Sequence, residues 1–202
     1  MSTVKNKAKI AVLVSGGGTN LQALIDAQKS GIIENGEIVL VISNKAGAYA
    51  LERAANAGIK TETVIKKETP DFEGKLIELL EENGIDVIVL AGFMSILSER
   101  FTSRFEKRIL NVHPSLIPSF CGEGFYGLRV HQAALDYGVK VTGATVHFVN
   151  EIPDGGQIIM QKAVEIQPDD TPETLQKRVM EQAEWIILPL SVEKVCKDIT
   201  EG

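Results

Sequence analysis

The sequence predicts an α/β protein with a mostly parallel, twisted β-sheet and helices on its faces. Between Lys9 and Ile109, short runs rich in β-branched residues alternate with segments whose apolar residues lie three and four positions apart. This alternation is typical of βαβ units, in which a helix joins two parallel strands. Such crossovers are right-handed in nearly all known sheets, so the hand of the fold follows from the same pattern.

Strands and helices alternate regularly in this first part of the chain. The expected strands are Lys9–Val14, Glu37–Ser43, Thr61–Ile65, Asp86–Ala91 and Arg108–His113. The expected helices are Asn20–Lys29, Tyr49–Ala57, Phe72–Glu82 and Ser98–Phe105. Each helix carries an apolar stripe that can cover one face of the sheet.

The pattern changes after the fifth strand. The elements expected there are a Gly- and Pro-rich loop at 114–127, a short helix at Val130–Asp136 and two strands at Val141–Val149 and Gln157–Ile166. A tight turn joins the last two strands, which predicts an antiparallel hairpin. A final helix begins at the N-cap and proline of Asp170-Thr171-Pro172 and is expected to run to about Val195.

Composition narrows the class of function. The 27 acidic and 21 basic residues leave a net charge of −6, with no basic stripe for a nucleic-acid backbone, so small-molecule substrates are expected. The first apolar run, Ile10–Val14, is far too short for a membrane span or a secretory signal. Cys121 and Cys196 match no metal-ligand or redox spacing. We therefore expect a cytoplasmic protein of one domain, residues 1–202, without a metal.

A glycine loop follows the first strand and opens the first helix, at Ser15-Gly16-Gly17-Gly18-Thr19-Asn20. Backbone N–H groups and the helix dipole favour an anion at such a place. A dinucleotide fingerprint would need glycine at Leu21, and a P-loop would need Gly-Lys-Ser/Thr after the glycines. The loop is thus expected to hold one terminal phosphate; the alternative is a turn that only packs strand against helix.

Polar side chains end the fifth strand. Asn111 and His113 are two residues apart, so they point to the same face of the sheet. An amide and an imidazole placed together can stabilise an oxyanion or exchange a proton. Ligands of open α/β sheets bind outside the carboxyl ends of the strands, where this pair, the glycine loop and the loop at Gly92 would meet. A purely structural hydrogen-bonded pair is the alternative.

Asp154 lies in the turn of the hairpin, where simple turn chemistry explains an aspartate. If the turn folds over the strand ends, its carboxylate would raise the pKa of His113 and favour the charged imidazole. His131, at the start of a helix, and His147, within a strand, are interpreted as ordinary solvated or core residues.

Taken together, these segments resemble the glycinamide ribonucleotide transformylase family from Lys9 to about Val195. The motifs that carry the resemblance occur in family order and are Val14–Gln22, Ile42–Lys45, Val89–Met94, Leu110–Pro118 and Asp154–Gly156. The resemblance implies a Rossmann-like formyltransferase fold, with a phosphate-binding half at 1–105 and a catalytic and folate-binding half at 106–202.

The resemblance also implies roles for individual residues. The implied catalytic residues are Asn111, His113 and Asp154. The implied ribonucleotide-binding residues are Gly18, Thr19, Asn20 and Glu184. The implied folate-binding residues are Met94, Ser95, Ile96, Leu97 and again Asn111.

The implied reaction moves the formyl group of 10-formyltetrahydrofolate, the co-substrate, to the amine of glycinamide ribonucleotide in purine biosynthesis. No metal is implied, and either a monomer or a homodimer fits. The chain departs from the family pattern at Ser95, where many members carry arginine, in a longer stretch at 120–130 and in a shorter one at 63–73. Lys66 or Lys67 is the expected substitute for the family's basic residue near the folate tail.

Three alternatives share parts of this pattern. Methionyl-tRNA formyltransferase and formyltetrahydrofolate hydrolase use the same Asn, His and Asp but add a further domain, which we do not expect here. A catalytically silent nucleotide-binding module would need the glycine loop without the three polar residues.

Overall fold

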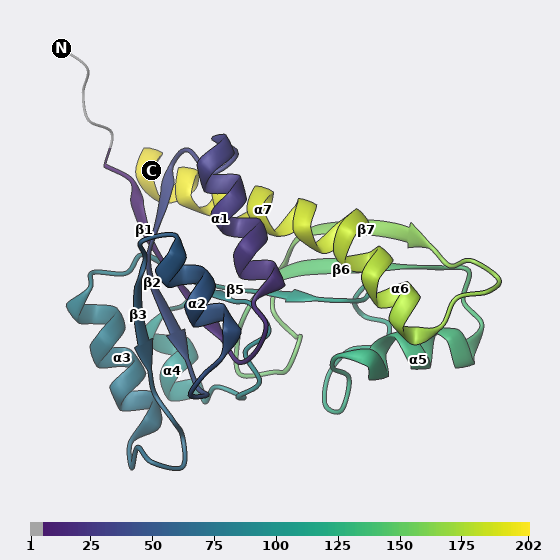
Figure 1. The fold of residues 1–202 in the computed structure, drawn as a ribbon, viewed down its shortest axis with the longest axis horizontal. Coiled ribbons are helices and arrows are strands. Elements are labelled where there is room, and N and C mark those ends of the chain that lie inside the picture. Colours follow the sequence, from purple (N-terminus) through teal and green to yellow (C-terminus); the bar gives the residue numbers. More distant parts are fainter. Residues whose placement is uncertain (1–5) are drawn as a thin grey trace.

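The computed structural model describes residues 6–202, and these contain one sheet of seven strands (Figure 1). The strands are β1 (Ala8–Val14), β2 (Gly36–Ser43), β3 (Lys60–Thr63), β4 (Val87–Leu90), β5 (Ile109–His113), β6 (Val141–Phe148) and β7 (Ile158–Glu165). Their order across the sheet is β3-β2-β1-β4-β5-β6-β7. The first five pair in parallel, and β6 and β7 are antiparallel to their neighbours. The predicted fold class, including the late hairpin, is confirmed.

Helices cover both faces of the sheet. They are α1 (Thr19–Ser30), α2 (Tyr49–Asn56), α3 (Phe72–Glu82), α4 (Glu99–Arg104), α5 (Leu128–Tyr137), α6 (Pro172–Val179), a π-helical turn η1 (Met180–Glu184) and α7 (Trp185–Glu201). The apolar sides of α1, α2 and α7 pack on one face and those of α3 and α4 on the other (Figure 1). Two separate hydrophobic cores result, one on each face.

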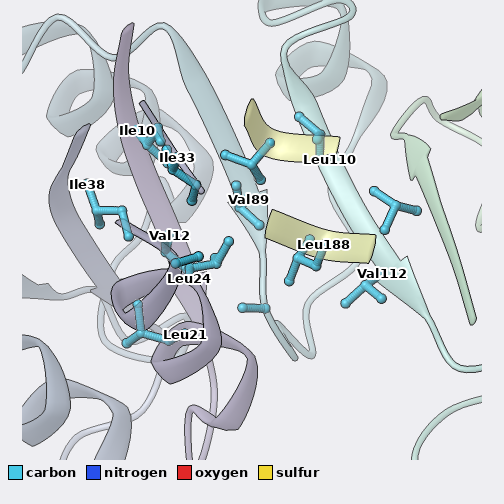
Figure 2. Close-up of a cluster of buried hydrophobic side chains, with 14 of the residues drawn as sticks. Ile10, Val12, Leu21, Leu24, Ile33, Ile38, Val89, Leu110, Val112 and Leu188 are labelled. Atoms are coloured by element: carbon cyan, nitrogen blue, oxygen red, sulfur yellow. The ribbon is translucent and has the colours of Figure 1, made fainter. Parts of the chain in front are cut away.

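The larger core lies between the sheet and the pair α1 and α7. Figure 2 shows Val12 and Val89 of the central strands beside Leu24 of α1 and Leu188 of α7. All four side chains are fully buried. Burial of each such side chain stabilises the fold by roughly 1.5–3 kcal/mol, so this layer fixes α7 against the sheet.

Alternation along β5 and β6 decides where the polar residues lie. Leu110 and Val112 of β5 point into the larger core, together with Val146 of β6. Asn111 and His113 therefore point to the opposite face. The second core includes Ile109 of β5 and the partly buried Val149, but no described residue of β6 belongs to it. The loop at 114–127 reaches this part of the face, where its backbone contacts His113 and Asp154.

The strand order reverses between β1 and β4, which are neighbours in the sheet. In open α/β sheets, ligands bind outside the carboxyl ends of the strands at such a reversal. The glycine loop follows β1, the loop at Gly92 follows β4, and β5 ends beside them at His113. The predicted convergence of these three segments is therefore confirmed.

The last helix differs from its prediction. It consists of three consecutive elements, α6, the π-helical turn η1 and α7, and it extends to Glu201 instead of about Val195. Thr171 caps its start, because its side chain accepts from Thr174 N–H, and Pro172 occupies the first turn. Pro189 lies inside α7 and has no N–H to donate, yet the helix continues because it is buried against the sheet.

Candidate active site

Three polar side chains of β5 and β6 form the floor of the candidate site. Asn111 and His147 stand opposite each other in the antiparallel register, and Asn111 Nδ2 lies 3.3 Å from His147 Nε2. His113 lies one turn of the pleat further along β5 and is 4% exposed. The three side chains therefore lie together on the face of the sheet that the loops cover.

The turn between β6 and β7 brings Asp154 over this floor. Its Oδ2 lies 3.4 Å from His113 Nδ1, and its Oδ1 lies 3.5 Å from His147 Nε2. Gly122 N–H donates to Oδ2 at 2.9 Å, so the loop at 114–127 also holds the carboxylate. Asp154 has a φ of 56°, in the left-handed region that aspartate tolerates better than most residues. The structure thus brings together Asn111, His113 and Asp154.

Both ring nitrogens of His113 face oxygen atoms. Nε2 is 2.8 Å from the carbonyl oxygen of Phe120, and Nδ1 faces the carboxylate of Asp154. Burial lowers the pKa of His113 below its ordinary value and outweighs the charge of Asp154 and the Phe120 carbonyl, which act to raise it. The expectation that Asp154 would raise the His113 pKa and favour the charged imidazole is therefore corrected: the carboxylate acts in the expected direction, but the effect of burial is larger and the pKa falls.

The Asp154 carboxyl remains ionised. Burial acts to raise its pKa, but the His147 ring, the charge of His113 and the Gly122 N–H together bring the pKa below its ordinary value. Asp154 is therefore an anion at neutral pH, placed between two imidazoles.

The glycine loop opens α1 at the carboxyl end of β1. Gly18 adopts a φ of 72°, and the Cβ of another residue there would lie 2.6 Å from Ala50 Cβ. Only glycine fits this turn without strain. Arg53 Nε donates to the Gly17 carbonyl at 2.8 Å and so fixes the loop from α2. Gly18 has no side chain to cap the first turn of α1, which leaves the N-terminus of that helix suited to an anion.

Glu184 faces the glycine loop from the end of η1. It is 6% exposed, and its Oε2 accepts from Asn20 Nδ2 at 2.8 Å. Burial raises the pKa of Glu184 above its ordinary value, although the bond from Asn20 opposes this. Asn20 Oδ1 is buried and has no hydrogen-bond partner among residues 6–202. A carboxylate beside an unpaired amide oxygen suits hydroxyl or amine donors. Its neighbour Glu181 is exposed, so Glu184 is the glutamate that turns inward.

A pocket lies between the loop after β4 and the turn at 149–154. Ser95, Ile96 and Leu97 line it on one side, Asn111 and His147 form its base, and the turn with Asp154 closes the other side. Met94 does not line this pocket. Its N–H donates to Ser15 Oγ at 2.8 Å. The Ser95 hydroxyl accepts from Asn44 Nδ2 at 2.9 Å. Apolar walls with a few polar groups suit a flat heterocycle.

Sequence reasoning missed three contributors to this site. His147 reaches both Asn111 and Asp154, whereas the sequence suggested only an ordinary strand residue. The backbones of Phe120 and Gly122 contact His113 and Asp154. The register of β5 against β6 is the one signal that would have placed His147, and no local pattern encodes it.

His131 is buried in α5, and its pKa falls to about 4 through burial and the nearby charge of His113. Within residues 6–202, no cluster of His, Cys, Asp and Glu is arranged to hold a metal ion. In the same range, no helix combines the length and apolar character needed to cross a membrane.

Comparisons with known proteins agree with this geometry. The formyl transferase family model matches residues 8–191. Phosphoribosylglycinamide formyltransferase of Haemophilus influenzae is 46% identical over 96% of this chain and 88% of its own length. The crystal structure of glycinamide ribonucleotide transformylase 1 from Symbiobacterium toebii superposes with a TM-score of 0.89, at 40% identity over 95% of this chain and 89% of that one.

A trifunctional purine biosynthetic protein, adenosine-3 of Gallus gallus, is 47% identical over 94% of this chain, which spans 18% of its length. The chain thus corresponds to one part of that larger protein. The family model covers most of the described residues, and the bacterial relative matches nearly end to end. This chain belongs to the formyl transferase family and, within it, groups with the phosphoribosylglycinamide formyltransferases.

Proposed function

We propose that this enzyme transfers the formyl group of 10-formyltetrahydrofolate to the amine of N1-(5-phospho-D-ribosyl)glycinamide in the synthesis of purines. The names of its full-length bacterial relatives support this reaction. The observation that carries the proposal is one cluster of side chains that contains Asn111, His113 and Asp154, which are separated by up to 43 positions in the chain. Small molecules are its proposed partners, and a cytoplasmic location is part of the proposal.

The proposed chemistry is direct transfer. The amine nitrogen attacks the formyl carbon, and a new C–N bond forms as the carbonyl oxygen becomes an oxyanion. The Asn111 NH2 group and, in its protonated form, His113 stabilise this oxyanion. Asp154 and His113 take the proton that the amine loses and return it to N10 of the folate as the bond from N10 to the formyl carbon breaks.

Binding follows from the two flanking loops. Gly18, Thr19 and Asn20 hold the phosphate at the start of α1, and Glu184 accepts a hydroxyl or amine donor of the ribonucleotide. Ser95, Ile96 and Leu97 enclose the pteridine of the co-substrate, with Met94 fixing that loop through Ser15. One chain supplies all these residues, so either a monomer or a homodimer fits.

The test measures loss of the formylfolate spectrophotometrically, with and without the ribonucleotide. We expect no loss without the ribonucleotide; rapid loss would indicate a hydrolase. Asn111→Ala and Asp154→Asn should lower kcat by roughly 10²–10³-fold while calorimetry shows that the ribonucleotide still binds. Asp169→Asn, an exposed carboxylate outside the site, is the matched control. Turnover near the unmodified rate in both site variants would refute the assignment.

A further inference from the structure

The His147 ring is held in one orientation and one tautomer by its own strand. Its side chain is almost fully buried, and Nδ1 lies 2.8 Å from the carbonyl oxygen of Phe148. A carbonyl oxygen can only accept, so Nδ1 carries the proton. In the neutral ring, Nε2 then has a lone pair and no hydrogen, and it points at Asn111 and Asp154.

Only one neighbour can satisfy that lone pair. The Asp154 carboxylate, 3.5 Å away, is itself an acceptor, whereas Asn111 Nδ2 at 3.3 Å can donate an N–H. The two ends of an asparagine amide have nearly the same shape, so packing alone does not decide which end faces a ligand. A flipped amide would present its oxygen, instead of its NH2 group, to a developing oxyanion.

We propose that His147 is a positioning residue that fixes the Asn111 amide with its NH2 end toward the reacting carbonyl. The inference rests on the proposed function, because it gives Asn111 the role of an oxyanion donor. One N–H of Asn111 donates to His147, which leaves the second N–H for a ligand in the pocket that both residues line. His147 thus acts through Asn111 and does not touch the reacting atoms.

The pairing of β5 with β6 aligns the His147 ring with the Asn111 amide. Asn111 and His147 are direct partners in the β5–β6 register, so their Cβ atoms lie about 4.5–5.5 Å apart. The pairing of β6 with β7 shifts between Val146 and His147. Such irregularities bend a strand and re-aim its side chains, and they are common beside active sites.

Three substitutions test the contact. His147→Leu removes the acceptor, and His147→Asn can replace Nδ1 but is too short to reach Asn111. His147→Gln places an amide oxygen near the position of Nε2 and can accept the same N–H. We expect Leu and Asn variants to lose about tenfold or more in kcat with an unchanged ribonucleotide Kd, and the Gln variant to recover a large part of that loss.

A double-mutant cycle tests whether His147 acts through Asn111. In the Asn111→Ala background, His147→Leu should have little further effect on kcat, because the group it orients is gone. Additive losses, an unchanged kcat in His147→Leu, or non-additivity with Asp154→Asn in place of Asn111→Ala would each overturn the inference. Equal losses in the Gln and Asn variants would do the same.

Two controls separate a loss of folding, and a failure of the proposed function, from a failure of the role given to His147. Thermal unfolding of each variant shows whether it folds; if His147→Leu does not, the comparison of His147→Gln with His147→Asn carries the test. Asn111→Ala alone separates the two proposals. If Asn111→Ala retains activity, the proposed function of the site fails. If Asn111→Ala is inactive while His147→Leu is fully active, only the role of His147 fails.

Discussion

His131 makes the fold sensitive to acid. The side chain is fully buried in α5, and within the part of the chain that the structure describes neither Nδ1 nor Nε2 has a hydrogen-bond partner. A charged imidazole there would be both desolvated and unpaired. Burial, with a smaller contribution from the charge of His113, accordingly lowers the pKa of His131 from 6.5 to about 4. Replacing His131 by Leu removes the titrating group and keeps an apolar side chain of similar size.

The sign of the effect follows from which state binds the proton. Below pH 6.5 the unfolded chain protonates this histidine, while the folded chain resists protonation until about pH 4. Uptake of the proton by the unfolded state alone destabilises the fold as the pH falls. Above pH 6.5 the group contributes no pH dependence. At pH 5 the loss is about 2 kcal/mol, and it approaches its full value below pH 4.

The assay is urea unfolding at pH 7.5 and pH 5 for the unmodified chain and for His131→Leu. The unmodified chain should lose about 2 kcal/mol more free energy of unfolding between the two pH values than the variant does. Gln132→Ala, at an exposed position of the same helix, should keep the full pH dependence. If the unmodified chain and His131→Leu lose the same free energy, His131 titrates normally and the reasoning is wrong.

Three further substitutions test the loops and the sheet. Gly18→Ala places alanine at a left-handed φ and overlaps with Ala50, so the free energy of unfolding in urea should fall by about 1–3 kcal/mol and the ribonucleotide KM should rise. Gly17 has open space around it, so Gly17→Ala should lower the free energy of unfolding by less than half as much. Gly143→Ala places Cβ 2.1 Å from a backbone oxygen of β7 and should separate β6 from β7, seen as faster amide exchange in the hairpin; unchanged exchange would contradict it. Glu184→Gln replaces the buried carboxyl group with an amide and should raise the ribonucleotide KM about tenfold with little change in the formylfolate KM; equal changes in both would contradict its assignment.

Much of the fold could be predicted from local pattern. The parallel strands are β-branched runs buried on both faces, as β4 shows, and the helices between them carry regular apolar stripes. The broken last helix could not be predicted in this way. Buried packing keeps Pro189 inside α7, and the π-helical turn that directs Glu184 inward has no local sequence signature.

Some residues of the candidate site could likewise be predicted from local sequence, and others could not. Asn111 and His113 could be predicted as a pair, because they are two residues apart on one strand. Asp154 was recognised by resemblance only, since an aspartate in a turn has a sufficient local explanation. His147 was missed because its partner lies 36 positions away across two strands. Each proposed binding region also combines residues that are far apart in the chain, as the hydrogen bond between Asn20 and Glu184 shows.

The His113 ring differs by one proton from the imidazolium form that the proposed reaction uses. In either neutral tautomer, one ring nitrogen directs a lone pair at an oxygen, either the Phe120 carbonyl or the Asp154 carboxylate. Only the imidazolium satisfies both contacts, yet burial keeps the pKa below its ordinary value, so the ring is mostly neutral at pH 7 before substrate binds. In the reaction proposed above, an oxyanion beside the ring would add a second negative charge and favour protonation. The proton that the attacking amine releases in that proposal would therefore reach the ring at the step in which the affinity of the ring for a proton rises.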